Sequence, residues 1–271
     1  MDVRKLDAMS MEEKMRFLIA AMQEEMPEYS GCTVPEDADG QWRLVRSLFN
    51  VRPPMPASTA FLAVQDSLLQ AITAQKGVAD AAALCPVPLD ERLFLWQGDI
   101  TTLRADAIVN AANSRLLGCW RPLHSCIDNC IHTMSGVQLR LKCHEIMRAQ
   151  GHEEATGTAK ITPGYNLPAK YVLHTVGPIV DGLVTPEHER LLAGCYRSCL
   201  DLAEENGCRS IAFCCISTGV FMFPAQRAAQ IAVQTVRGHL DSCPGIRQVI
   251  FNVFRDEDRT IYEHVLGRTP C

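Results

Sequence analysis

Two cysteines and a histidine follow one another closely in the segment NAANSRLLGCWRPLHSC, residues 110–126. The spacing Cys119-x4-His124-x-Cys126 puts three side chains of the types that zinc prefers into one predicted loop. Three protein ligands with an open fourth position are typical of a catalytic zinc site. Because the chain contains 13 cysteines and 8 histidines, chance clustering is an alternative at this point.

Three other predicted loops carry polar or aromatic residues at the ends of apolar segments. Asp99, in WQGDI, could accept a hydrogen bond from a nucleobase amino group, or could be an ordinary turn residue. The segment STGVFMFP (217–224) could bind a diphosphate through its backbone amides, or could be a tight strand-to-helix turn. It lacks the GxxxxGK(S/T) pattern of nucleoside triphosphatases. Phe254 could stack on an aromatic base, or could belong to the core.

These segments are expected at the edge of an α/β structure. From about residue 90 onward, short apolar segments alternate with helical patterns, which predicts a mostly parallel sheet covered by helices on both faces. In such sheets, ligands bind beyond the carboxyl ends of the strands. The predicted strands are RLFLWQ (92–97), DAIVNA (106–111), AKITPG (159–164), KYVLHTVG (170–177), SIAFCCIS (210–217) and QVIFNVF (248–254), and the predicted helices span 127–149, 187–206, 224–240 and 258–266.

Residues 1–85 have a different pattern and are predicted to form a helical extension packed on a main domain of residues 86–271. Ser10 followed by Glu13 is a capping-box pattern at the start of a first helix. The break VRPPMPAS precedes a second predicted helix over 58–77. The apolar stripes consist of Met11, Met15, Leu18, Ile19 and Met22 in the first helix and Phe61, Leu68, Leu69 and Ile72 in the second.

Composition and charge argue against several classes of partner. The net charge is -5 at pH 7 and the pI is about 5.9, so the charge does not indicate binding to nucleic acid or to an anionic membrane. No run approaches the roughly 18 apolar residues of a transmembrane helix. The amino terminus lacks the apolar core of a signal peptide. We expect a cytoplasmic protein whose cysteines are reduced or bind metal.

Taken together, the motifs resemble those of the macrodomain family of ADP-ribose-binding modules. The matching motifs are QGDI (97–100), DAIVNAAN (106–113), IDNCIH (127–132), STGVFMFP (217–224) and VFRDED (253–258). The resemblance implies a three-layer α/β/α sandwich. Ordinary macrodomains carry a glycine-rich loop where this chain has GCWRPLHSC, and this segment is similar to the zinc-containing subgroup of protein-ADP-ribose hydrolases. That subgroup also carries an amino-terminal helical extension. The resemblance implies one zinc ion, held by Cys119, His124 and Cys126.

The resemblance also implies a role for each loop. The adenine-binding positions fall on Asp99 and Ile100, and the adenine-stacking aromatic residue falls on Phe254. The asparagine that faces the distal ribose falls on Asn113, and the acidic residue at the loop-to-helix junction falls on Asp128. Both are candidate catalytic residues. The diphosphate loop falls on Ser217, Thr218, Gly219, Val220 and Phe221.

The implied activity is zinc-dependent hydrolysis that removes mono-ADP-ribose from protein side chains, with acidic residues as the targets. Zinc would polarise a ribose hydroxyl or the scissile linkage, or would lower the pKa of a bound water. Asp128 would orient the water, act as a general base or tune the zinc. Alternatively, it would only stabilise its helix through a favourable interaction with the helix dipole. The implied partners are an ADP-ribosylated protein, a sirtuin-type ADP-ribosyltransferase and a lipoyl-carrier protein.

Two other functions are compatible with the same motifs. One is an ADP-ribose-binding module with a structural zinc, which a fourth ligand such as Cys130 or Cys143 would favour. The other is deacetylation of O-acetyl-ADP-ribose, which needs the same site and differs in the bond that is cleaved. Cleavage of poly-ADP-ribose is not indicated, because paired glutamates are missing from these loops.

Overall fold

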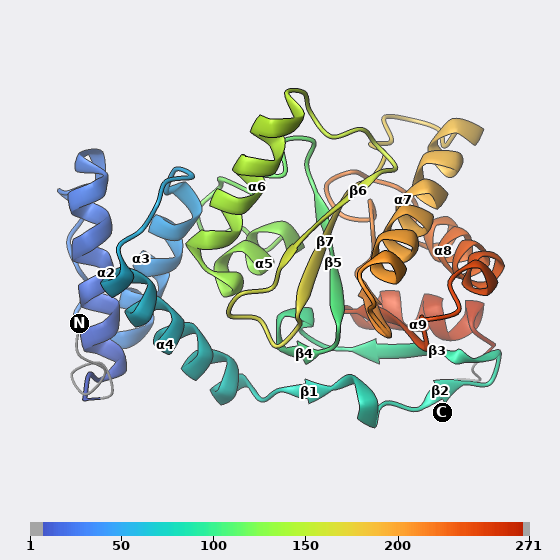
Figure 1. The fold of residues 1–271 in the computed structure, drawn as a ribbon, viewed down its shortest axis with the longest axis horizontal. Coiled ribbons are helices and arrows are strands. Elements are labelled where there is room, and N and C mark those ends of the chain that lie inside the picture. Colours follow the sequence, from blue (N-terminus) through green and yellow to red (C-terminus); the bar gives the residue numbers. More distant parts are fainter. Residues whose placement is uncertain (1–7, 268–271) are drawn as a thin grey trace.

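The computed structural model describes residues 8–267 of the chain. Figure 1 shows a helical extension on one side of a sheet that carries further helices. The strands are β1 (Ala79–Asp80), β2 (Pro86–Val87), β3 (Asp90–Gln97), β4 (Leu103–Arg104), β5 (Ala107–Ala112), β6 (Ala159–Pro163), β7 (Tyr171–Val176), β8 (Ser210–Phe213) and β9 (Gln248–Val253). The α-helices are α2 (Met11–Glu25), α3 (Ala38–Val51), α4 (Thr59–Lys76), α5 (Ile127–Ser135), α6 (Val137–Gln150), α7 (Pro186–Glu205), α8 (Ala225–His239) and α9 (Asp256–Val265).

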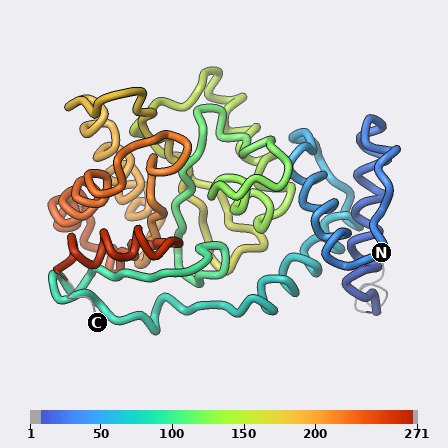
Figure 2. Tube along the Cα trace, turned by 180° about the vertical axis from the view of Figure 1, so that it is seen from behind, coloured from blue at the N-terminus to red at the C-terminus, as the bar shows by residue number. Residues whose placement is uncertain are grey.

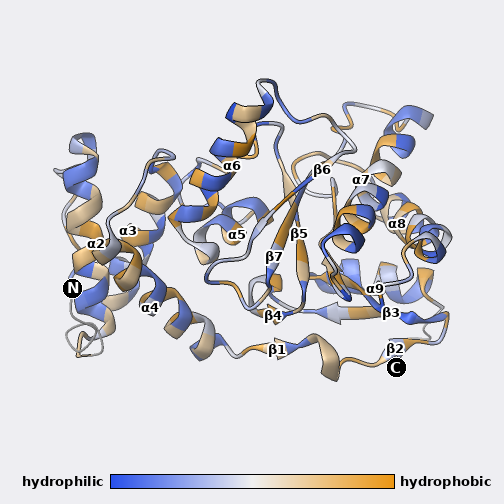
Figure 3. Ribbon diagram, viewed as in Figure 1, coloured by the Kyte–Doolittle hydropathy of each residue, from blue (hydrophilic) through white to orange (hydrophobic). Residues whose placement is uncertain are grey.

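The main sheet has seven strands in the order β2-β3-β9-β8-β5-β7-β6. The inner strands β3, β9, β8, β5 and β7 pair in parallel, whereas β2 and β6 pair antiparallel at the two edges. Successive side chains of β7 and β9 point to opposite faces, and nearly all of them are buried, so both faces must be covered. Figure 3 shows the apolar strands between helices whose outer faces are hydrophilic. The predicted α/β class with a mixed, mostly parallel sheet is confirmed.

Two of the predicted elements differ from the structure by more than two residues at one end. The helix predicted over 127–149 is two helices, because Gly136 adopts a left-handed φ of 97° between α5 and α6. The amide of Val137 in the first turn of α6 donates to Oε1 of Gln65 from α4, at 2.8 Å. The strand predicted over 210–217 ends at Phe213, where pairing with β9 stops.

The extension contains the two predicted helices and one that was not predicted. The capping box of Ser10 and Glu13 is present at the start of α2. Helix α3, which was missed, begins after Asp37, whose side chain accepts a hydrogen bond from the amide of Gly40. Arg52, buried just after α3, pairs with Glu25 of α2 at 2.6 Å and so ties these two helices together.

The extension packs directly on the sheet domain through α3 and α4, which lie beside α5 and α6 in Figures 1 and 2. Asn50 of α3 donates to Thr133 of α5 at 3.1 Å. Arg140 of α6 donates to the backbone carbonyls of Phe49 and Arg52, at 3.0 and 2.6 Å. Further along, β1 pairs in parallel with β4. These contacts show that the extension and the sheet domain are packed together. They do not test the domain boundary at residue 85, which stays a prediction.

None of the helices within residues 8–267 has the length and apolar character needed to span a membrane.

Candidate active site

The predicted site segments lie beyond the carboxyl ends of the parallel strands. Asp99 follows β3, Asn113 follows β5 and Phe254 follows β9, while residues 217–224 lie between β8 and α8. Because these strands run in parallel, their carboxyl ends meet at one edge of the sheet. The fold therefore brings segments that are far apart in the sequence to the same edge.

The three predicted metal ligands form a compact cluster. The ligand atoms of Cys119, His124 and Cys126 all lie within 4.8 Å of one another. The distance from Cys119 Sγ to His124 Nδ1 is 3.5 Å. A sulfur and a nitrogen bound to one tetrahedral zinc ion are expected about 3.5 Å apart. Within residues 8–267 this cluster has three members, and neither Cys130 nor Cys143 belongs to it. The donor set and its spacing therefore fit a zinc ion with one open position.

The ligand loop, residues 113–126 between β5 and α5, owes its shape to left-handed backbone rather than to regular secondary structure. Leu116, Gly118 and Leu123 have φ values of 57°, 78° and 58°. A Cβ atom at Gly118 would approach the His132 ring to 2.8 Å, so only glycine fits there without a shift. Burial raises the pKa of the Cys126 thiol, so this group keeps its proton at neutral pH unless a bound cation displaces it.

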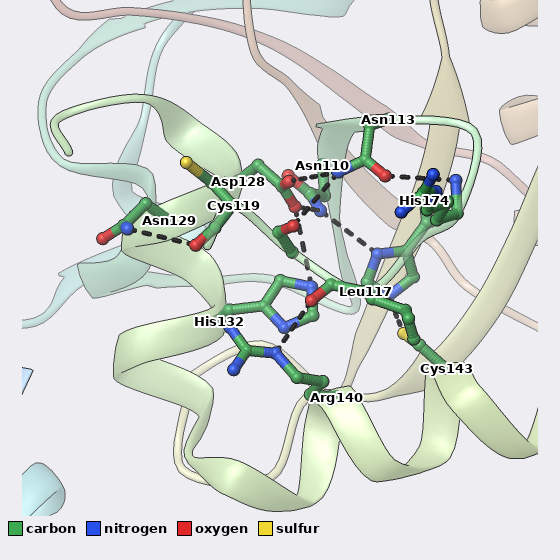
Figure 4. Close-up of polar contacts among 12 residues, drawn as sticks. Asn110, Asn113, Leu117, Cys119, Asp128, Asn129, His132, Arg140, Cys143 and His174 are labelled. Atoms are coloured by element: carbon green, nitrogen blue, oxygen red, sulfur yellow. Dashed lines mark hydrogen bonds and ion pairs between the residues drawn. The ribbon is translucent and has the colours of Figure 1, made fainter. Parts of the chain in front are cut away.

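A buried carboxylate lies at the start of α5, next to the ligand loop (Figure 4). Asp128 is 5% exposed, and its two oxygens accept hydrogen bonds from the amide groups of Asn110 at 2.8 Å and Asn113 at 3.2 Å. Burial raises the pKa of Asp128 to about 6, although the two amides and the charge of Arg140 act in the opposite direction. The carboxylate is mostly ionised at neutral pH but can take up a proton at little cost.

A buried neutral histidine fixes the amide orientation. Asn110 donates to Nδ1 of His174 at 3.2 Å, and Nε2 of His174 lies 3.0 Å from the hydroxyl of Thr162. Burial lowers the pKa of His174 to about 3, so the ring is uncharged. Asn113 joins this network to the ligand loop, because its amide also donates to the carbonyl of Gly118 at 3.1 Å.

Asn110, His174, Arg140 and Asn129 also belong to the site, although no role was predicted for them from the sequence. Asn110 and His174 are partners in the pairing of β5 with β7, a relation that depends on knowing the strand order. The local signal for Asn110 was only its position in the motif DAIVNAAN.

Asp99 is both a turn residue and an available acceptor. Its Oδ1 accepts hydrogen bonds from the amide and hydroxyl of Thr101 at 3.0 and 2.6 Å, which caps the short 3-10 helix Ile100–Thr102. Its Oδ2 pairs with Lys76 Nζ of α4 at 2.9 Å. Burial alone would raise the pKa of Asp99, but the contacts with Thr101 and Lys76 outweigh it and lower that pKa. Ile100 is 2% exposed, so its side chain belongs to the core.

Phe254 is an exposed aromatic ring at the end of β9. It is 74% exposed, so the core alternative is wrong. Its carbonyl accepts a hydrogen bond from Gln97 at 3.3 Å, which links the ends of β3 and β9. The ring is free to stack on a planar ligand.

The loop over 217–224 presents backbone donors. Its internal hydrogen bonds use the amides of Met222 and Phe223, and within the described chain no acceptor contacts the amides of Gly219, Val220 and Phe221. Such free amides can bind an anion. The Ser217 side chain is buried, and its hydroxyl has no hydrogen-bond partner among residues 8–267. A Cβ atom at Gly177 would come within 2.1 Å of this hydroxyl oxygen. The Thr218 hydroxyl donates to the Cys215 carbonyl at 3.1 Å.

Comparison with known proteins gives the family. A model of the Macro domain matches residues 109–232. A relative from Treponema medium named protein-ADP-ribose hydrolase is 54% identical over 261 residues, which cover 96% of this chain and 100% of the relative. A relative of the same name from Staphylococcus aureus (strain MSSA476) is 50% identical over 256 residues, covering 94% of this chain and 96% of the relative.

Two solved structures are similar to this fold. A variant of the Oceanobacillus iheyensis macrodomain with ADPR has a TM-score of 0.59 and 39% identity, covering 65% of this chain and 91% of that chain. The Trypanosoma brucei macrodomain in complex with ADP-ribose has a TM-score of 0.62 and 32% identity, covering 82% of this chain and 95% of that chain. The chain therefore belongs to the macrodomain family, in the group whose curated members are named protein-ADP-ribose hydrolases.

Proposed function

We propose that this protein-ADP-ribose hydrolase removes mono-ADP-ribose from protein side chains with the help of a zinc ion held by Cys119, His124 and Cys126. The hydrolase activity itself rests on relatives of that name that are 50% and 54% identical over 94% or more of the chain. The observation that carries the zinc role is the three-ligand cluster, whose Cys119–His124 distance of 3.5 Å suits tetrahedral zinc.

The chemistry is addition of water to the anomeric carbon of the distal ribose. The bond from that carbon to the acceptor oxygen breaks, and the products are ADP-ribose, the free side chain and a proton. A zinc ion at these ligands would supply Lewis acidity to a ribose oxygen or to water. Asp128, held by Asn110 and Asn113, would orient the attacking water and accept its proton. Asn113 would orient the ribose.

The rest of the ligand would follow the same edge of the sheet. The free amides of residues 219–221 would bind the diphosphate, and Asp99 with Phe254 would hold the adenine. Acidic side chains as targets, a sirtuin-type transferase as partner and a lipoyl-carrier protein as substrate rest on the resemblance to the zinc-containing subgroup alone.

Two alternatives differ in measurable ways. A structural zinc in a pure binding module would call for a fourth ligand, and within residues 8–267 the cluster has three. A deacetylase of O-acetyl-ADP-ribose would release acetate from the free metabolite. Parallel assays on that metabolite and on mono-ADP-ribosylated protein separate it from the hydrolase.

The first prediction concerns the metal ligands. Cys126→Ala is expected to lose zinc and to lower the turnover of a mono-ADP-ribosylated protein by at least about 100-fold, because the Lewis acid is lost. Affinity for ADP-ribose should change little, because the adenine and diphosphate contacts remain. Zinc content, release of ADP-ribose and calorimetric affinity are measured together. Cys32→Ala, at an exposed site in the extension, is the control and should resemble the wild type.

Chelation provides the matching test without a mutation. Removal of zinc should abolish turnover, and added zinc should restore it in the wild type but not in Cys126→Ala. Full turnover by the metal-free protein, or no release of ADP-ribose by a wild type that binds it, would contradict the zinc-hydrolase proposal.

The second prediction concerns the buried carboxylate. Asp128→Asn keeps the shape but removes the charge, so kcat should fall by about 10² to 10⁴ while zinc content and ADP-ribose affinity are retained. The control is Asp201→Asn on α7, whose carboxylate pairs with His239. An unchanged kcat in Asp128→Asn would mean that the carboxylate only supports the start of α5.

The third prediction concerns the exposed ring. Phe254→Ala should weaken ADP-ribose and ADP binding by about tenfold or more, since stacking of a base on an aromatic ring contributes roughly 1–3 kcal/mol. The melting temperature should not change, because the ring is exposed. Leu89→Ala, another exposed apolar position located before β3, serves as the control. Equal affinities for both variants would argue against stacking.

A further inference from the structure

We infer that Arg46 and Asn50 of helix α3 are positioning residues for residues 118–126 of the ligand loop, so that the amino-terminal extension helps to form the proposed metal site. The link to the metal rests on the proposed function, whereas the bracing of the loop does not. The inference is carried by hydrogen bonds between residues that lie far apart in the sequence.

Arg46 holds the backbone of the ligand loop directly and through one intermediary. Its Nη2 donates to the backbone carbonyl of His124 at 2.7 Å and to Oδ1 of Asn129 at 3.0 Å. The amide group of Asn129, which is fully buried, donates to the carbonyls of Arg121 at 3.0 Å and Cys119 at 3.4 Å. One guanidinium thus fixes the backbone of two of the three ligand residues.

Asn50 acts on the residue directly before His124. Its Oδ1 accepts a hydrogen bond from the amide of Leu123 at 3.0 Å, and its Nδ2 donates to Thr133 at 3.1 Å. Asn50 is 1% exposed. Leu123 has a left-handed φ of 58°, a conformation that a residue with a Cβ adopts only with support from its surroundings. Asn50 supplies that support from the extension.

The loop has little structure of its own to replace these contacts. Between the end of β5 and the start of α5, the only backbone hydrogen bonds that both begin and end among residues 113–126 join Leu116 to Asn113 and His124 to Arg121. Arg140 supports the start of the loop, because its Nε donates to the carbonyl of Leu117 at 2.8 Å while Nη1 binds carbonyls at the end of α3. Without α3, the ligands would sample many arrangements, and metal affinity would fall by the fraction of time spent in the right one.

The experiment compares full-length wild type, Arg46→Met, Arg46→Lys and Asn50→Ala. Arg43→Met is the matched control, because Arg43 lies on the same helix and is exposed. Hydrogen exchange of the metal-free proteins reports the loop, and competition with a chromophoric chelator reports zinc affinity. The absorption of the Co²⁺-loaded proteins reports thiolate and imidazole ligation. ADP-ribose affinity and melting temperature are measured alongside.

The expected result is local. In metal-free Arg46→Met and Asn50→Ala, residues 118–126 should exchange at least about tenfold faster than in Arg43→Met, while the sheet keeps its protection. Zinc affinity should fall about 10- to 100-fold, as for other residues that orient metal ligands. The Co²⁺ bands should weaken or shift, and ADP-ribose affinity should stay the same. Arg46→Lys, which keeps one donor and the charge, should recover part of the zinc affinity.

Other outcomes overturn the inference. Loop exchange and zinc affinity equal to those of Arg43→Met would show that the loop holds its shape without α3. Faster exchange spread over the whole protein in all three variants, Arg46→Lys included, would assign these residues to global stability instead. If even the wild type binds no zinc, the proposed function fails, while the exchange measurements still decide whether α3 braces the loop.

Discussion

The buried carboxylate of Asp128 is the constraint on which the site depends. An ionised group that is 5% exposed must receive hydrogen bonds, and the cost of leaving it without donors would be several kcal/mol. Asn110 on β5 and Asn113 just beyond it supply these donors. Because Asp128 must reach both amides, their positions fix where α5 starts relative to the edge of the sheet. The loop that connects the two elements must then fold back within a short span, and the ligand atoms of its cysteines and histidine converge to within 4.8 Å of one another.

Much of the fold could be predicted because hydrophobic periodicity reports local structure. The apolar segments over 92–97 and 170–177 are strands in the sheet, and the capping box of Ser10 and Glu13 starts a helix. The sequence did not reveal the break at Gly136, since the helical pattern of apolar residues runs through it and the break depends on Gln65 from a distant helix. Helix α3 was missed, although Asp37 marks its start.

In the site, too, the features that could be predicted depend on residues close together in the sequence, whereas the features that could not depend on residues far apart. The proposed metal ligands lie within a few residues of one another, so the sequence could place them in one loop, although their spacing alone left chance clustering as an alternative. The contacts that orient them join residues about 80 positions apart, as Arg46 and His124 do, and no local pattern encodes such a pair. The exposure of Phe254 was also undetermined, because an aromatic residue at a strand end is compatible with core or surface.

The ion pair between Lys76 and Asp99 would have a consequence for the base that the proposed adenine site accepts. Because its contacts lower the pKa of Asp99, this side chain is an ionised, acceptor-only group at neutral pH. Thr101 donates twice to Oδ1, and Lys76 donates to Oδ2, which leaves a lone pair on Oδ2. A 6-amino purine can donate to that lone pair, whereas the oxygen of a 6-oxo purine would be repelled by it. A purine bound next to Asp99 would therefore be selected by the atom attached to its carbon 6, which favours adenine over hypoxanthine or guanine.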